Sequence, residues 1–483
     1  MSRPLLLGID EGTSAVKAIA YDLDLRPVAG HERRVATSQP HPGWVEQDAD
    51  EVLEAVVDAV AAVLQEVVTL GGEVVACGLD HQGESVLAWD AATGRPLSPI
   101  VVWQDRRALE VLDRLSPDAA AEVSRRSGLP VDPYFSAGKL AWLLERGLPH
   151  GARLGTVDAF LTDRLGGIYA TDPSTASRTQ LSDVAAGAGQ WDPWLCACFG
   201  VPVDVLPAIE DSLGELGTLS HPRWPVALPL RARVVDQQAA LAGAGCVVPG
   251  RVKATYGTGV FVLAHAGDVP PASGGALLPT VAWRHGAVTE FALDGGVFSA
   301  GSLLEWLARD MGLAPDVPAL AALAREVPDA GGVRVLPALA GLGAPWWQPS
   351  ARAAVAGLTG ASRPAHVAHA ALEGVAWRVA DILEVIAEHA PVEVLRVDGG
   401  LTRSPLLLEL QADAAGVAVE AGEDATASGA AALAAVGAGL WPSTRAIAER
   451  VPAGDRTTPR TDAAWRTEGH EAWRSFVRAA GAL

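Results

Sequence analysis

The stretch LLLGIDEGTSAVKAIAYD, residues 5–22, places two short apolar segments on either side of the turn EGTS. Residues 5–10 and 17–22 are mostly apolar, so each predicts a buried strand. The turn offers backbone N–H and hydroxyl groups, with Asp10 before it and Lys17 after it, and so could hold a phosphate group. For this segment alone an ordinary hairpin loop is the favoured alternative, because short glycine-containing signals are weak.

The first 90 residues alternate strands with a helix. Residues 48–68 place apolar side chains on one face behind an acidic first turn, which is typical of an amphipathic helix. Residues 73–80 are an apolar run that indicates a buried strand. Strands and helices in this order imply an α/β sheet that is covered on its faces.

A comparable pattern begins near residue 250, where KATYGTGVF (253–261) again suggests a strand, a Gly/Thr turn and a strand. The later segments predict a long helix at 363–390 and a strand at 394–400. Another helix is predicted to begin at Ser404, which would be its N-cap. Residues 451–463 are interpreted as a polar linker before a short terminal helix. We therefore expect two α/β lobes, residues 1–246 and 247–483, with a cleft between them.

The composition favours a well-packed globular protein that acts on a small molecule. The chain has 483 residues, of which 49% are hydrophobic and 19% charged, with a formal net charge of -20. A protein surface that binds phosphate groups of nucleic acid or lipid needs clustered Lys and Arg. The negative net charge therefore disfavours nucleic acid and anionic membrane surfaces as partners. No secretion signal opens the chain, and no stretch approaches the roughly 20 apolar residues of a spanning helix. We expect a cytoplasmic protein whose four cysteines are reduced, namely Cys77, Cys196, Cys198 and Cys246.

Asp236 is a candidate catalytic base. It follows an apolar strand and precedes an Ala- and Gly-rich helix in RVVDQQAALAGAG (233–245). A helix N-terminus keeps a carboxylate ionised, which suits a group that must accept a hydroxyl proton. A plain N-cap is the equally common alternative.

The segment DHQGES (80–85) follows a strand and contains several polar or charged side chains. The carboxyl end of a strand is a usual place for ligand-binding groups in α/β sheets, although a solvated turn is an equal alternative. His81 receives no separate role, because a lone histidine there is more often a satisfied turn residue than a metal ligand.

Trp103 and Tyr134 stand beside polar groups in VVWQDRR (101–107) and PYFSAGK (133–139). An aromatic face with hydroxyl partners at its edge would suit a carbohydrate. Core packing is the alternative, and we prefer it for Trp142, which is on the apolar face of its predicted helix.

Together these segments resemble the FGGY family of carbohydrate kinases, most strongly its glycerol kinase branch. Eight blocks occur in family order and cover nearly the whole chain: GIDEGTSAVKAI, VVWQDRR, PYFSAGKLAWLL, TDPSTASRT, DQQAALAG, ATYGTGVF, LAGLGAPWWQPSARAAVAGLTG and LRVDGGLTRSP. The resemblance implies an α/β, two-lobed actin/hexokinase-like (ribonuclease H-like) ATPase fold with an interlobe cleft. It also implies ATP and Mg²⁺ as the cofactors of a kinase that phosphorylates a polyol or sugar.

The resemblance also implies roles for individual residues. Asp236 would be the catalytic base, and Asp10 would orient magnesium through water. The ATP-binding residues would be Thr13, Ser14, Lys17 and Thr258 at the phosphates and Gly301, Gly400 and Ser404 along the nucleoside. The residues around the acceptor would be Gly83, Glu84, Trp103, Tyr134, Asp236, Gln237 and Phe261.

Three positions depart from the glycerol kinase pattern. Gly83 stands where glycerol kinases have an arginine, and Ser404 and Glu305 replace their usual Asn and Gln. Without that arginine the site lacks the guanidinium N–H donors for substrate hydroxyls and has more space. A larger polyol or ketose of the tetritol, xylulose or ribulose type is therefore the alternative to glycerol. A non-enzymatic actin-like ATP-binding module is the alternative from another class, and a homo-oligomer, dimer or tetramer, stays open.

Overall fold

The computed structural model describes residues 2–272, 275–423 and 425–481, which pack as two compact units. Unit 1 contains Met1–Val247, Ala266–Ala292 and Ala425–Val451, and unit 2 contains Val248–His265, Leu293–Asp424 and Pro452–Leu483. The first change of unit, after Val247, lies beside the boundary expected from the sequence. Unit 1 also takes two later segments, so its packing differs from the two continuous lobes expected.

A six-stranded sheet forms the centre of unit 1, with the strand order β11-β12-β5-β1-β2-β3. Its strands are β11 (Leu213–Leu219), β12 (Leu228–Val235), β5 (Gly72–His81), β1 (Arg3–Glu11), β2 (Ala15–Tyr21) and β3 (Pro27–Arg34). The two apolar segments of the quoted stretch are β1 and β2, which pair antiparallel, while β1 and β12 both run parallel to β5. The predicted hairpin and the buried strand after the first helix are thus confirmed.

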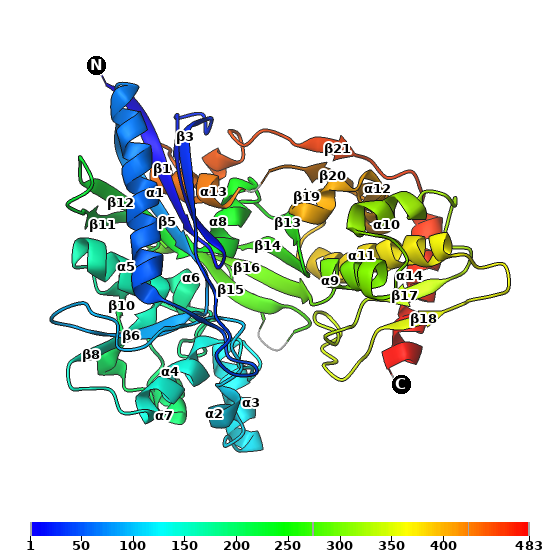
Figure 1. Ribbon diagram of the computed structural model, residues 1–483, viewed down its shortest axis with the longest axis horizontal. Helices are drawn as coiled ribbons and strands as arrows, with labels where there is room; N and C mark the ends of the chain where they lie inside the picture. Colours follow the sequence, from blue (N-terminus) through cyan, green and yellow to red (C-terminus); the bar gives the residue numbers. More distant parts are fainter. Residues whose placement is uncertain (1, 273–274, 424, 482–483) are drawn as a thin grey trace. The chain divides into compact units, whose positions relative to one another are not determined.

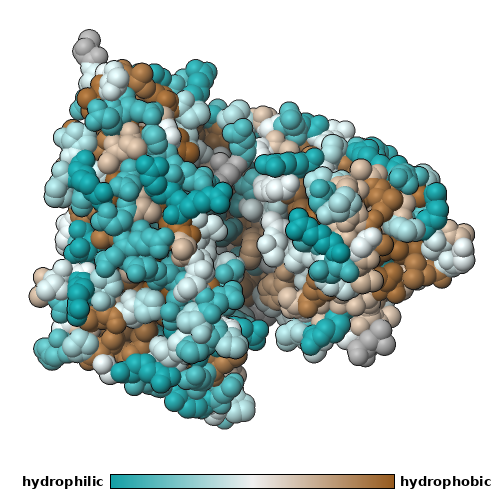
Figure 2. Space-filling view, in the orientation of Figure 1, coloured by the Kyte–Doolittle hydropathy of each residue, from teal (hydrophilic) through white to brown (hydrophobic). Residues whose placement is uncertain are grey.

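Helix α1 (Ala49–Thr69) covers one face of this sheet (Figure 1). Asp48 caps the helix by accepting hydrogen bonds from the backbone N–H groups of Asp50 and Glu51. Its apolar side shares one core cluster with Leu5, Leu7 and Ile9 of β1. Its outward side carries charged residues, and Figure 2 shows hydrophilic residues over this part of unit 1.

A second helix, α13 (Thr426–Gly437), packs against β1, β5, β12 and helix α8 (Asp236–Gly243). Its sequence, TASGAAALAAVG, consists almost entirely of small residues. A Cβ atom added to Gly8 would lie 1.9 Å from the carbonyl oxygen of Ala427, and one added to Gly429 would lie 1.8 Å from that of Ala239. Close backbone contact therefore joins a late segment of the chain to its first strand.

The remainder of unit 1 surrounds a second core that contains the buried Trp142, as predicted. It includes a four-stranded sheet, β4 (Glu46–Gln47), β7 (Ile100–Val101), β6 (Val86–Asp90) and β8 (Ala152–Thr156), and the pair β9 (Ala170–Thr171) and β10 (Ala208–Ile209). The helices are α2 (Leu109–Leu112), α3 (Pro117–Ser127), α4 (Ser136–Glu145), α5 (Val157–Gly166), α6 (Pro173–Ala176) and α7 (Pro193–Phe199).

A second large sheet has the strand order β15-β16-β14-β13-β19-β20-β21, in which β15 and the first residues of β16 belong to the Ala266–Ala292 segment of unit 1. Unit 2 also contains the pair β17 (Arg334–Leu336) and β18 (Ala354–Ala356). The larger sheet contains β15 (Leu278–His285), β16 (Val288–Val297), β14 (Val260–Gly267), β13 (Arg251–Tyr256), β19 (Val394–Asp398), β20 (Ala418–Ala421) and β21 (Asp455–Thr457). The helices are α9 (Gly301–Glu305), α10 (Val317–Ala324), α11 (Pro364–Ala387), α12 (Pro405–Ala415) and α14 (Ala463–Gly481).

Two predictions about the end of the chain need correction. The expected polar linker contains β21, which pairs antiparallel with β20, so its backbone hydrogen bonds are used in a sheet. The terminal helix α14 has 19 residues and is not short. It is fixed to α11 at Asp381, which accepts hydrogen bonds from Arg378 of its own helix and from His470 and Trp473 of α14. Ser404, by contrast, is the N-cap of α12, as predicted.

Candidate active site

Three parallel strands of unit 1 end at one edge of the sheet. Glu11 at the end of β1 and Val235 at the end of β12 are both in register with His81 at the end of β5. Ligand-binding groups of α/β sheets gather at the carboxyl ends of the strands. The sheet thereby brings the predicted residues Asp10, Glu84 and Asp236 to the same edge, although they are far apart in sequence.

The turn after β1 is held by side chains from other segments. The indole Nε1 of Trp103 donates a hydrogen bond of 3.0 Å to Thr13 Oγ1, and Gln47 Nε2 donates one of 2.7 Å to the Thr13 carbonyl oxygen. Lys17 Nζ lies 3.5 Å from a carboxylate oxygen of Asp10, while Ser14 is exposed. The turn is therefore a fixed loop with hydroxyl groups, a cation and a carboxylate.

Glu11 is a fully buried acid next to this loop. Its Oε1 accepts a 2.7 Å hydrogen bond from Gln82 Nε2. Burial, together with the negative charges of Asp10 and Asp236, raises the pKa of Glu11 well above its ordinary value, against the lowering effect of the Gln82 hydrogen bonds. The buried position therefore favours the neutral form of Glu11 more than an exposed position would.

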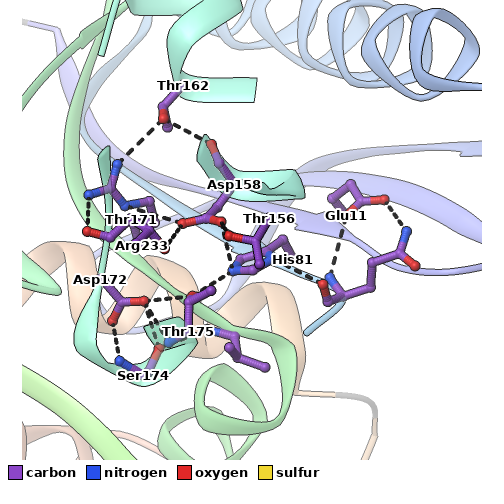
Figure 3. A network of polar contacts seen from close by, with 12 residues as sticks. Glu11, His81, Thr156, Asp158, Thr162, Thr171, Asp172, Ser174, Thr175 and Arg233 are labelled. Atoms are coloured by element: carbon purple, nitrogen blue, oxygen red, sulfur yellow. Dashed lines mark hydrogen bonds and ion pairs between the residues drawn. The ribbon is translucent and has the colours of Figure 1, made fainter. Parts of the chain in front are cut away.

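The segment 80–85 is buried, so the solvated turn that the sequence left open is wrong. His81 Nδ1 donates to the Gln82 carbonyl oxygen at 3.0 Å, and Nε2 lies 2.9 Å from Thr175 Oγ1. Figure 3 shows this histidine in a network with Asp158, which accepts from Thr171 Oγ1 at 2.7 Å. Buried polar groups that are hydrogen-bonded in this way fix the strand end behind the site.

Glu84, Trp103 and Tyr134, which the family resemblance places around the acceptor, lie close together and are called the acceptor cluster. The rings of Trp103 and Tyr134 meet edge to face with centroids 5.6 Å apart, and both side chains are half-buried. Two residues to which the sequence assigned no role support the cluster. Arg178 Nε donates to Glu84 Oε1 at 2.7 Å, and Lys139 Nζ donates to the Tyr134 carbonyl oxygen at 2.5 Å. Burial lowers the pKa of Lys139 to about 7, although the Glu84 charge opposes the change.

Asp236 is the first residue of α8, and its Oδ1 accepts a 2.6 Å hydrogen bond from the Gln237 backbone N–H. The N-cap position itself is occupied by Val235, so the plain N-cap alternative is wrong. The Asp236 and Gln237 side chains are half-buried. A carboxylate in this position is stabilised by the helix dipole and can accept a proton.

Gly83 packs against Val235, the last residue of β12. A Cβ atom added there would lie 2.8 Å from Val235 Cγ1. A side chain at this position would therefore require the Val235 side chain to shift.

A pocket of about 800 Å³ lies wholly within unit 2. Four predicted ATP-binding residues line it, Thr258, Gly301, Gly400 and Ser404, together with Glu305. Much of the remaining wall is apolar, and Arg325 and Arg403, which the sequence did not single out, add positive charge. Phe261, on β14, is half-buried and is not among its lining residues. The size and the mixture of apolar wall and few polar groups suit a nucleoside.

Within the described part of the chain, no group of three or more His, Cys, Asp or Glu side chains is placed to hold a metal ion. Mg²⁺ in kinases usually binds one or two carboxylates, water and the substrate phosphates. Asp10, with Asp236 at the same sheet edge, fits that requirement. The four cysteines are free, and no helix among the described residues is long and apolar enough to cross a membrane.

Comparison with known proteins agrees with this geometry. The N-terminal and C-terminal domains of the FGGY family of carbohydrate kinases match residues 5–243 and 252–438. A glycerol kinase from Alkalilimnicola ehrlichii is 42% identical over 450 residues, 90% of each chain, and one from Citrifermentans bemidjiense is 39% identical over 98% of each chain.

Solved structures show the same fold. Plasmodium falciparum glycerol kinase with ADP superposes with a TM-score of 0.91 at 27% identity, covering 99% of this chain and 98% of that one. A xyloylose kinase from Brucella ovis has a TM-score of 0.89 at 26% identity, covering 99% of this chain and 100% of that one. The fold is thus the two-domain, actin/hexokinase-like ATPase fold of these kinases. The chain belongs to the FGGY family of carbohydrate kinases and is a phosphotransferase that acts on a hydroxyl group.

Proposed function

We propose that this kinase transfers the γ-phosphoryl group of ATP to a hydroxyl group of a neutral polyol or ketose. The observation that carries the proposal is the shared sheet edge of unit 1, where the phosphate-loop candidate, Glu84 and Asp236 follow three adjacent parallel strands. Phosphoryl transfer needs positioning and charge stabilisation more than covalent chemistry. A loop with hydroxyl groups, a cation and a helix-terminal carboxylate supply these requirements.

Asp236 would remove the proton from the acceptor hydroxyl as it attacks. Its place at the N-terminus of α8 favours the ionised form that a base requires. The acceptor cluster would bind the polyol, with the Glu84 carboxylate accepting hydroxyl hydrogen bonds and the two rings packing on C–H groups. Gln237, Phe261 and the Gly83 backbone are the further acceptor contacts that the family resemblance implies.

The unit 2 pocket would bind the nucleoside, and Thr13, Ser14 and Lys17 would contact the phosphates together with Thr258. Asp10 would hold Mg²⁺ through water. When bound, the ion would neutralise phosphate charge. The free thiols are compatible with a reducing compartment, and we propose the cytoplasm as the location.

Glycerol is proposed as a weak acceptor, because Gly83 offers no side-chain donors for substrate hydroxyls. The relatives named above are glycerol and xyloylose kinases, which leaves both small polyols and ketoses as candidates. A non-enzymatic ATP-binding module is no longer favoured, because the chain belongs to a family of kinases.

A coupled ADP-release assay tests the proposal with glycerol, erythritol, threitol, xylulose and ribulose. We expect at least one acceptor to raise ADP release well above the rate without acceptor, and glycerol to have a high KM. Folded protein that responds to none of the five would contradict the proposal. A glycerol KM in the low micromolar range would contradict only the inference from Gly83.

A further inference from the structure

Arg178 follows the short helix α6 and reaches the acceptor cluster of unit 1. Its Nε donates a 2.7 Å hydrogen bond to Oε1 of Glu84, and the two side chains are only 6% and 5% exposed. A buried carboxylate is strongly disfavoured unless an opposite charge and hydrogen bonds compensate for the lost water. Arg178 supplies such a charge directly to the carboxylate proposed to bind the acceptor.

The same guanidinium also lies against the aromatic part of the site. Its central carbon is 5.7 Å from the ring centroid of Tyr134 and 5.5 Å from that of Phe135. A cation within about 6 Å of a ring centroid is attracted to the ring. One side chain therefore contacts both the carboxylate and the aromatic wall of the acceptor cluster.

Glu84 has an unusual backbone conformation, with a φ of 59°. This left-handed region is uncommon for residues other than glycine and persists where surrounding contacts enforce it. Ser136 Oγ donates a 3.2 Å hydrogen bond to the Glu84 carbonyl oxygen and so holds the main chain. Arg178 holds the side chain of the same residue.

A guanidinium could not be supplied from position 83 without rearrangement. A Cβ atom there would press on Val235, the residue immediately before Asp236. In this chain the donor beside Glu84 comes instead from Arg178, which is 94 residues away in sequence.

We infer that Arg178 is a positioning residue that determines acceptor affinity and choice. It orients the Glu84 carboxylate and the Tyr134 ring, and both act on the acceptor according to the proposed function, on which this inference rests. Hydrogen bonds weaken steeply with distance and angle, so a Glu84 carboxylate that is no longer oriented binds hydroxyl groups poorly. ATP binding depends on other residues and should not change.

The test compares Arg178→Gln and Arg178→Lys, each in the wild-type and the Glu84→Gln background. Arg396→Gln is the matched control, because it removes the arginine of another largely buried pair, in which Arg396 Nε lies 3.1 Å from Glu420. Steady-state kinetics give kcat, the acceptor KM and the ATP KM, and urea unfolding confirms that each variant is folded.

Arg178→Gln should raise the acceptor KM by about 10- to 100-fold, with the ATP KM within about twofold of wild type. Arg178→Lys should raise the acceptor KM less than Arg178→Gln, since lysine keeps the positive charge but lacks the planar guanidinium group. In the Glu84→Gln background the same substitution should add less than about threefold, because the contact is already broken. The control should leave the acceptor KM unchanged.

An unchanged acceptor KM in folded Arg178→Gln would overturn the inference. An equal rise in acceptor KM in the wild-type and the Glu84→Gln backgrounds would also overturn it. In both cases an active wild-type protein would still uphold the proposed function. An equal rise in both KM values would also overturn it, because that result indicates a general structural role. If Arg178→Gln does not fold, Arg178→Lys decides: a selective rise in acceptor KM supports the inference, and an unchanged value overturns it. A wild-type protein without any acceptor activity would overturn both proposals.

Discussion

Replacing Gly429 by alanine tests whether the packing of α13 on α8 sets the position of the candidate base. The added Cβ would lie 1.8 Å from the Ala239 carbonyl oxygen, at least 1.2 Å closer than the 3.0 Å that Cβ atoms need. The atom it meets belongs to the backbone and cannot rotate away. The two helices must therefore separate locally.

The expected magnitudes follow from this displacement. Overpacking costs about 1–3 kcal/mol, and alanine regains about 1 kcal/mol over glycine in helix propensity, so the free energy of unfolding should fall by up to about 2 kcal/mol. Asp236 begins α8 three residues before Ala239. A misplacement of about 1 Å at a reacting group can lower the rate by about 100-fold, so we expect a loss of that order in kcat. The ATP KM should stay near the wild-type value, since the pocket residues all belong to unit 2.

Steady-state kinetics and urea unfolding provide the measurements. Ser428→Ala is the matched control, because it changes the neighbouring residue of the same helix without adding an atom. A Gly429→Ala protein with wild-type stability and a kcat within about threefold of wild type would refute the reasoning, since that loss is far below the rate effect of a 1 Å misplacement.

Asp236→Asn should lower kcat by about 10²- to 10⁴-fold with unchanged ATP affinity by calorimetry, and a loss below tenfold would exclude Asp236 as the base. Asp381→Asn should lower the free energy of unfolding by about 3–5 kcal/mol in urea at pH 7, because it leaves the Arg378 guanidinium buried without its partner; wild-type stability would contradict this. Lys139→Met should remove a pH dependence of stability. The pKa of Lys139 is about 7 in the fold and 10.5 in an unfolded chain. Between these two pH values the unfolded state binds one more proton than the folded state, so the free energy of unfolding of the wild type rises with pH. The rise is at most about 1.4 kcal/mol per pH unit. Urea unfolding at pH 7, 8 and 9 should show this rise relative to Lys139→Met, and parallel curves would contradict it.

The parts of the fold that could be predicted are those with local signals. The strands beside the turn EGTS, the amphipathic helix α1 and the N-cap at Ser404 are each encoded within a few residues. The shared acidic edge could be anticipated because Asp10, Glu84 and Asp236 each lie at the end of a strand or within three residues after it. The sequence therefore identifies the residues at this edge but not the distances between them.

The role of α13 could not be predicted, because its sequence of small residues has no amphipathic pattern to show which surface it covers. That information lies in glycines of β1 and α8, which are far away in the chain. Arg178 was missed for a similar reason. It lies in a recognised block, but its partner Glu84 is distant, and no local pattern shows that the two side chains meet.

The return of α13 to unit 1 also has a consequence for synthesis on the ribosome. Many multidomain proteins fold from the N-terminus as each domain emerges. Here the first strand, β1, has a face that is covered by α13, residues 426–437. The N-terminal unit therefore cannot complete its core until most of unit 2 has been translated. Fragments that end before this helix should expose that face of the sheet and need chaperone protection, even though they contain the predicted catalytic base.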